Sequence, residues 1–183
     1  KGEPGSEAWV TLELKTIADV GLVGYPNVGK SSLLAVLTAA RPKIGDYPFT
    51  TLEPNLGVAE RDHFTFVLAD IPGLIEGAHK GVGLGHQFLR HIERARVLLH
   101  VIDASVSDPV ATYEAVREEL ELYNPSVAAK PEVVALNKID REDVRTRVPD
   151  LLQQFKEQLP NTRVVAVSAI TTRGVDELVG VLI

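Results

Sequence analysis

The chain has 183 residues, of which 45% are apolar and 24% are charged, with a formal net charge of −6 and a pI near 5.4. This composition is typical of one soluble globular domain, and the acidic balance argues against a general nucleic-acid binder. The sequence has no cysteine, which excludes disulfides and thiolate metal sites and fits the cytoplasmic location that we expect, and no apolar run is long enough for a membrane span.

Apolar periodicity predicts the elements in chain order. An alternating segment predicts a strand at Ala8–Lys15. The strands predicted after it are 19–23, 55–60, 64–70, 97–103, 133–137 and 163–167, and the predicted helices are 30–40, 109–123, 144–159 and 175–183. The polar segment ERDH between the strands at 55–60 and 64–70 predicts an antiparallel hairpin. The later alternation of strands and helices predicts a mostly parallel sheet.

The segment GYPNVGKSS, residues 24–32, matches the pattern GxxxxGK[ST] between a predicted strand and a predicted helix. Gly24 and Gly29 allow the backbone to curl so that successive N–H groups point inward, next to the N-terminus of the helix. Lys30 adds a full positive charge for the terminal phosphates, and Ser31 offers a hydroxyl to Mg²⁺. The sequence therefore predicts a phosphate-binding loop here.

A carboxylate stands at the end of the strand predicted at 64–70. Asp70 begins the segment DIPGLIEGAHKGVGLGHQFLR, and Gly73 completes a DxxG pattern. A carboxylate at the end of a buried strand near a phosphate loop is placed to hold Mg²⁺ through water. The backbone N–H of Gly73 would then approach a γ-phosphate. The connections 41–54 and 71–95 are both long, and loops of that length in a compact domain are usually functional or disordered.

The segment LNKID, residues 136–140, follows the predicted strand at 133–137. Asp140 can accept two hydrogen bonds side by side, and guanine presents two adjacent donors that adenine lacks. We expect Asn137 to brace this loop against the phosphate loop, and the stem of Lys138 to lie along the base. The segment SAI, residues 168–170, would give a backbone N–H to the guanine oxygen. The pattern favours GTP over ATP.

The ordered motifs GYPNVGKS, DIPG, NKID and SAI resemble those of the GTPases of the translation-factor-related class. The strings GYPNVGKSSLL, YPFTTLEPNLGV, DIPGLIEGAHKGVGLGHQFLRHIERA and LLHVIDAS resemble the Obg GTPases, from about Ile17 to the C-terminus. The resemblance implies a Ras-like P-loop GTPase fold, an α/β fold with a mostly parallel six-stranded sheet, one antiparallel strand and helices on both faces. It also implies GTP hydrolysis with Mg²⁺ by a molecular switch that associates with the large ribosomal subunit or its precursors, in subunit assembly or ribosome-linked stress signalling.

The chain begins at Lys1 and contains no methionine, and its front segment resembles the exit from the glycine-rich domain that precedes the GTPase domain in that family. We therefore expect an excised piece, with residues 1–15 as a remnant linker and strand and residues 16–183 as the GTPase domain. We expect this domain to be monomeric on its own.

Carried over by position, the resemblance implies nucleotide contacts from five segments. The expected contacts are Gly24, Tyr25, Pro26, Asn27, Val28, Gly29, Lys30 and Ser31, then Phe49, Thr50, Thr51, Leu52 and Glu53, then Asp70, Ile71, Pro72 and Gly73, then Asn137, Lys138, Ile139 and Asp140, and finally Ser168, Ala169 and Ile170. Ser31 and Thr51 are the expected Mg²⁺ ligands, and Lys30, Thr51 and Gly73 are the expected catalytic residues. Thr51 is preferred to Thr50 because it aligns with the single switch threonine of related GTPases.

Small GTPases carry a water-orienting glutamine directly after the DxxG glycine. Here that position is Leu74, which can neither donate nor accept a hydrogen bond, so we expect slow intrinsic turnover. Three hypotheses remain open: a partner supplies the missing group, K⁺ assists through Asn27, or Glu76 or His79 reaches in from the same loop. Asn27 stands where potassium-stimulated relatives carry an asparagine ligand. The alternative function is a guanine-nucleotide sensor with negligible hydrolysis.

Overall fold

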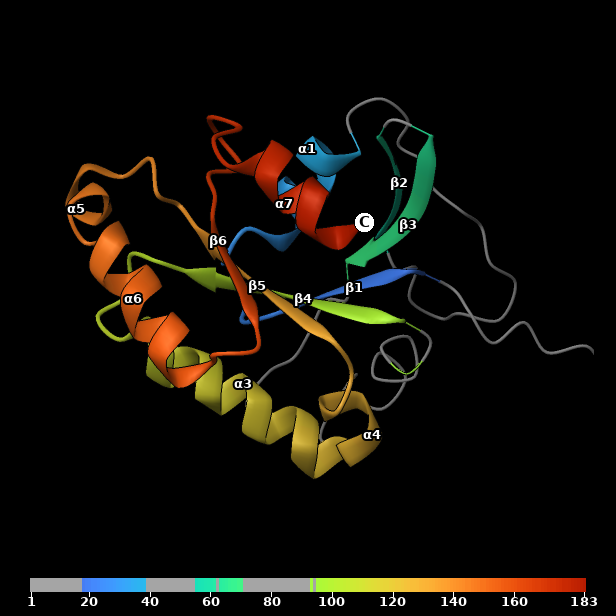
Figure 1. Cartoon of the computed structure of the whole chain (residues 1–183), viewed down its shortest axis with the longest axis horizontal. Coiled ribbons are helices and arrows are strands. Elements are labelled where there is room, and N and C mark those ends of the chain that lie inside the picture. Colours follow the sequence, from blue (N-terminus) through green and yellow to red (C-terminus); the bar gives the residue numbers. More distant parts are fainter. Residues whose placement is uncertain (1–17, 39–54, 62, 71–92, 94) are drawn as a thin grey trace, which may run out of the picture.

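One mixed sheet forms the centre of this computed structural model, which describes residues 18–38, 55–61, 63–70, 93 and 95–183 (Figure 1). The strands are β1 (Val20–Val23), β2 (Asn55–Arg61), β3 (Phe64–Asp70), β4 (Val97–Asp103), β5 (Glu132–Asn137) and β6 (Arg163–Ala166). The helices are α1 (Lys30–Leu37), α3 (Pro109–Tyr123), α4 (Pro125–Ala128), α5 (Glu142–Arg145), α6 (Val148–Gln158) and α7 (Val175–Leu182). No helix in the described ranges has the length and apolar character needed to cross a membrane.

The strand order is β2-β3-β1-β4-β5-β6, and only the β2–β3 pair is antiparallel. The predicted hairpin and the predicted mostly parallel sheet are therefore confirmed. Across the hairpin Asn55 pairs with Asp70, so the first residue of β2 lies beside the last residue of β3. The predicted strand at Ala8–Lys15 and the whole segment 1–15 lie outside the described residues.

Helices cover both faces of the sheet, as the family resemblance implies. Helices α1 and α7 lie on one face and α3, α4 and α6 on the other (Figure 1). Alternate residues of β5 point to opposite faces of the sheet. Val133 and Ala135 pack in the core beneath α1 and α7, and Val134 and Leu136 pack in the core beneath α3 and α6. This alternation follows from the two-residue period of a strand, and burial on both faces explains why β5 reads as one continuous apolar run.

The helix predicted over 144–159 is wrong in one respect, because the structure contains two helices there. Helix α5 ends at Arg145, and α6 begins at Val148 with a proline at its second position. Pro149 has no N–H to donate to the carbonyl group of residue 145, and its ring would clash with that carbonyl group in a continuous helix, whereas proline is tolerated in the first turn of a new one. The sequence analysis also missed the short helix α4, which begins directly after Asn124, where the Asn124 side chain accepts a hydrogen bond from the Ser126 N–H.

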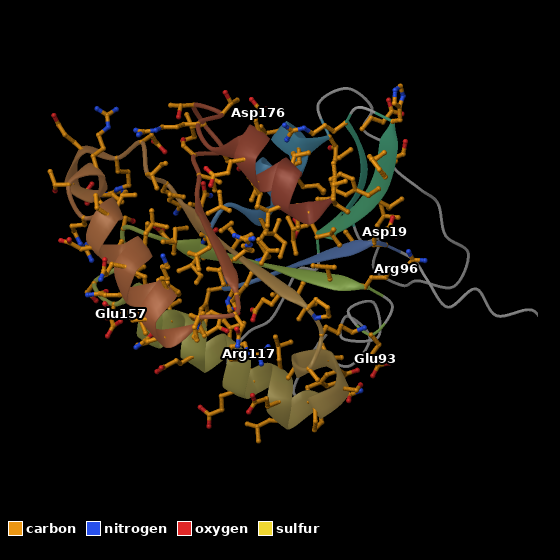
Figure 2. The ribbon with its side chains drawn as sticks, in the orientation of Figure 1. Asp19, Glu93, Arg96, Arg117, Glu157 and Asp176 are labelled. Atoms are coloured by element: carbon orange, nitrogen blue, oxygen red, sulfur yellow. The ribbon has the colours of Figure 1, made fainter. Side chains whose placement is uncertain are left out.

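A buried polar network holds α3 to the sheet at the amino end of β5. The Tyr113 hydroxyl donates to Glu132 Oε2 at 3.0 Å, and His100 Nδ1 lies 2.9 Å from Glu132 Oε1. Arg117 on α3, labelled in Figure 2, forms an ion pair with the same carboxylate at 3.5 Å. Burial, followed by the neighbouring Glu132 charge, raises the pKa of Tyr113, so this hydroxyl stays a donor at physiological pH. The network lies at the amino end of β5, so it does not involve Asn137 at the carboxyl end of the strand.

Candidate nucleotide-binding site

The loop between β1 and α1 needs glycine at both ends of its curl. Gly24 has φ +141°, and a Cβ there would lie 2.3 Å from the Val101 carbonyl oxygen. Gly29 has φ +100°, and a Cβ there would lie 2.3 Å from Asn137 Nδ2. L-residues rarely adopt either conformation, and neither site has room for a methyl group. The loop therefore follows a backbone path that only glycine permits, as the phosphate-loop motif predicts.

Lys30 folds back over this loop. Its Nζ donates to the carbonyl oxygens of Gly24 and Tyr25, both at 2.9 Å, and the residue is only 8% exposed. An ammonium group has three donors, so one N–H remains for a ligand. Burial lowers the pKa of Lys30, and the negative charge of Asp70 partly opposes that shift. A bound phosphate would act in the same direction as Asp70 and favour the charged ammonium group.

Ser31, in the first turn of α1, meets Asp70 at the carboxyl end of β3. The Ser31 hydroxyl donates to Asp70 Oδ2, and Asp70 is 2% exposed. The other carboxylate oxygen, Oδ1, is buried and has no hydrogen-bond partner among the described residues. A buried polar atom without a partner is unusual in native proteins and suggests a missing ligand or ion. Oxygen donors of this kind suit a hard divalent cation such as Mg²⁺.

Asn137 joins three segments that are far apart in the sequence. Its Nδ2 donates to the Val28 carbonyl oxygen at 2.8 Å, and its Oδ1 accepts from the Ala169 N–H at 3.1 Å. The side chain is 2% exposed, so both bonds form out of water. The predicted brace between the NKID segment and the phosphate loop is confirmed, and it extends to the SAI segment as well.

The Ser168 hydroxyl has a role that sequence reasoning missed. It donates to Asp140 Oδ1 at 2.7 Å and accepts from the Thr171 N–H at 3.1 Å, while the residue is fully buried. The sequence predicts only a backbone contact to the base from this segment. In the structure the hydroxyl also orients the carboxylate that would read guanine. Ile170, in the same segment, is 80% exposed.

Asp103, unlike Ser168, is not among the predicted site residues. It ends β4, and its Oδ2 lies 2.6 Å from Lys138 Nζ. The backbone N–H and the hydroxyl of Ser105 donate to Asp103 Oδ1 at 2.8 and 2.6 Å. Burial alone would raise the pKa of Asp103, but the hydrogen bonds from Lys138 and Ser105 outweigh it and lower the pKa. The carboxylate is therefore ionised throughout the physiological range.

The structure thus brings together the predicted contacts that it describes, at the carboxyl ends of the parallel strands. Parallel sheets bind ligands at this edge. Pro26 and Asn27 are exposed, and Asn27 has φ +63°, whereas Ile139 is buried. The predicted contacts and hydrolytic candidates that lie outside the described residues are Phe49, Thr50, Thr51, Leu52, Glu53, Ile71, Pro72, Gly73, Leu74, Glu76 and His79.

Comparison with known proteins adds three findings. Residues 19–138 match the model of the family described as "50S ribosome-binding GTPase". The chain is 58% identical over 182 residues to the GTPase Obg of Aquifex aeolicus, and the match covers 97% of the chain and 52% of that protein. It is 55% identical to the GTPase Obg of Desulforudis audaxviator, covering 98% of the chain and 42% of that protein. The chain thus spans about half the length of these curated relatives.

Two solved structures have the same fold. The G domain of the T. maritima FeoB iron transporter has a TM-score of 0.67 and 27% identity, and the match covers 89% of the chain and 94% of that domain. Era, solved with MgGDPNP and nucleotides 1506–1542 of 16S ribosomal RNA, has a TM-score of 0.68 and 28% identity, covering 89% of the chain and 54% of Era. Both are GTP-binding folds of the P-loop type, so the predicted fold class is confirmed.

Proposed function

This chain belongs to the family of 50S ribosome-binding GTPases, with Obg GTPases as its relatives, and from that membership we propose that it is a GTP-hydrolysing molecular switch. We assign this role to the GTPase domain at residues 16–183, with residues 1–15 as a remnant linker and strand. The observation that carries the proposal is the pair of hydrogen bonds made by Asn137. They hold the phosphate loop at a fixed distance from Asp140, as a ligand with a phosphate chain at one end and a guanine base at the other requires.

Each polar side chain of the phosphate end of the site, as far as the structure describes it, can be assigned a role in binding GTP and Mg²⁺. Lys30 would give its remaining N–H to the terminal phosphates, and the backbone N–H groups of the loop would take the oxygens around them. Ser31 and Asp70 fit Mg²⁺, because the buried Oδ1 of Asp70 has no partner among the residues described. When bound, Mg²⁺ would neutralise the charge that develops on the phosphate oxygens. Thr51 and Gly73 complete the proposal as the γ-phosphate contacts.

Hydrolysis in this proposal is slow, because Leu74 cannot orient water. K⁺ bound through Asn27 is one candidate aid, since Asn27 is exposed in the loop between β1 and α1. Its left-handed backbone, with φ +63°, turns the chain there.

Single-turnover hydrolysis tests the enzyme directly, with the chain in excess over GTP and Mg²⁺ present, in KCl and in NaCl. We expect phosphate release above the uncatalysed rate, and faster release in KCl. Lys30→Ala should weaken nucleotide binding by roughly tenfold to a hundredfold, because a hydrogen bond to a charged group is worth about 1.5–3 kcal/mol. The matched control is Lys156→Ala, at an exposed position on α6, which should leave nucleotide binding and the rate of phosphate release unchanged.

If the chain bound GTP tightly but released no phosphate, the proposed GTPase activity would be wrong, and the alternative function, a guanine-nucleotide sensor, would be supported. Equal rates in the two salts would remove K⁺ from the proposal and leave a partner, or Glu76 and His79, as the source of the missing group.

We extend the proposal to a cytoplasmic role on the large ribosomal subunit or its precursors, in subunit assembly or ribosome-linked stress signalling. The family description names the 50S subunit and supports this role, and the solved complex of Era with a segment of 16S ribosomal RNA supports binding of ribosomal RNA by a protein of this fold. A protein that contains this chain and its family's flanking domains should pellet with large subunits more strongly with a non-hydrolysable GTP analogue than with GDP. Equal pelleting in the two nucleotide states would contradict a switch at that surface.

A further inference from the structure

We propose that Asp103 is a positioning residue of the base site, which holds the Lys138 side chain so that its aliphatic stem forms one wall of the purine pocket. The inference rests on the proposed function, because it needs a purine nucleotide beside Asp140. It goes beyond that function in assigning a role to Asp103, which neither contacts the predicted phosphate loop nor belongs to the NKID segment. The observation behind it is the 2.6 Å ion pair between Asp103 Oδ2 and Lys138 Nζ.

The backbone of Lys138 gives the first reason. Its φ is +68°, in the left-handed region that residues with a Cβ rarely adopt. Such a conformation costs free energy and persists where the surrounding structure holds it in place. The neighbouring Asn137 is fixed on one side by its two hydrogen bonds, and on the other side the Ile139 N–H donates to the Val167 carbonyl oxygen at 3.3 Å. The ion pair to Asp103 is the contact that fixes the Lys138 side chain itself.

The anchoring of Asp103 gives the second reason. In the sheet Asp103 is the register partner of Asn137, so its carboxylate stands one residue away from Lys138 on the neighbouring strand. Its other oxygen accepts from both the backbone N–H and the hydroxyl of Ser105, which leaves little freedom of rotation. The Asp103 and Lys138 side chains are 14% and 29% exposed, so solvent screens their attraction less than it screens a surface pair. A rigid carboxylate of this kind can hold a long, flexible lysine in one rotamer.

The pair also sets what the lysine can do. With its ammonium group engaged by Asp103, Lys138 presents methylene groups to the pocket, and these pack against any planar purine ring. Asp140 behaves differently, because its contact depends on the donors of the guanine edge. Asp103 should therefore govern affinity for purine nucleotides in general, and Asp140 should govern the choice among them. This separation makes the two roles distinguishable in one set of measurements.

The test measures dissociation constants of the wild-type chain and of Asp103→Asn for GDP, for IDP, which lacks the 2-amino group, and for inorganic pyrophosphate, which has no base. We expect Asp103→Asn to weaken GDP and IDP by the same factor, about tenfold, since it replaces a charged hydrogen bond by a neutral one. Pyrophosphate binding should stay within twofold of wild type. A purely structural role would weaken all three ligands together, and that pattern would overturn the proposal.

Two further variants make the test specific. Asp143→Asn removes the same charge from an exposed ion pair with Arg141, only a few residues from the base segment, and should change none of the three constants. In a Lys138→Ala background Asp103→Asn should have no additional effect on GDP affinity, because the group that it positions is absent. An undiminished effect there, or wild-type GDP affinity in Asp103→Asn itself, would refute the proposal. Failure of the wild-type chain to bind GDP would instead refute the proposed function.

Discussion

Replacement of Asp140 by asparagine should move the chain's preference from guanine to xanthine nucleotides. The Ser168 hydroxyl donates to Asp140 Oδ1, so an asparagine at this position keeps its carbonyl oxygen there and turns its NH₂ group to the base. That NH₂ group would face the 2-amino group of guanine, donor against donor, but it would match the oxygen that xanthine carries at the same ring position. Because a buried polar group is then left unpaired, we expect GDP affinity to fall about a hundredfold.

Competition of GDP and XDP against a fluorescent GDP analogue measures both constants. Asp150→Asn, at an exposed position in the first turn of α6, provides a matched control with the same loss of charge. If Asp140→Asn retained wild-type preference for GDP, the assignment of Asp140 as the base selector would be wrong.

Replacement of Asn137 by alanine should weaken both the fold and nucleotide binding. The change leaves the buried Val28 carbonyl oxygen and the buried Ala169 N–H without their partner, and each unpaired group costs about 1–3 kcal/mol. We therefore expect the free energy of unfolding to fall by roughly 2–6 kcal/mol and GDP affinity to fall about a hundredfold, because the phosphate loop and the base segment lose the side chain that joins them.

Urea unfolding followed by fluorescence, together with GDP titration, measures the two effects. Asn137→Asp should be worse than Asn137→Ala, since it still accepts from Ala169 but places a buried carboxylate against the Val28 carbonyl oxygen. Asn161→Ala, in an exposed turn before β6, should change neither quantity. Wild-type stability and affinity in Asn137→Ala would show that the three segments hold their places without this side chain.

Local pattern was sufficient to predict the strands of the sheet and its one antiparallel pair, but not the order of the strands. The strands at 64–70 and 97–103 and the helix at 109–123 have the same bounds in the sequence analysis and in the structure. Their boundaries coincide with turn residues or with Asp108, whose side chain accepts from the Ala111 N–H at the start of α3. The helix over 144–159 was predicted in one piece because the apolar spacing continues across Pro149, and spacing alone does not register a missing N–H donor.

Site residues could be predicted where a short motif requires one particular residue type for its chemistry. Glycine at a phosphate loop and aspartate at a guanine edge are of this kind, and the pattern places both. Asp103 and the Ser168 hydroxyl are of the other kind, since their partners Lys138 and Asp140 lie 35 and 28 residues away along the chain. Which side chains meet across that separation depends on the register between β4 and β5 and on the pairing of β6 with β5. Neither is encoded in a local motif.

The pairing of Asn55 with Asp70 links the two stretches of the chain where the γ-phosphate contacts are expected. Residues 39–54 lead directly into β2, and residues 71–92 follow directly from β3, so both stretches are attached to the same end of one hairpin. Seven consecutive register pairs, from Asn55–Asp70 to Arg61–Phe64, join β2 and β3 along the whole hairpin. In the proposed switch, contacts of the γ-phosphate with Thr51 and with Gly73 would therefore act on the same end of one hairpin.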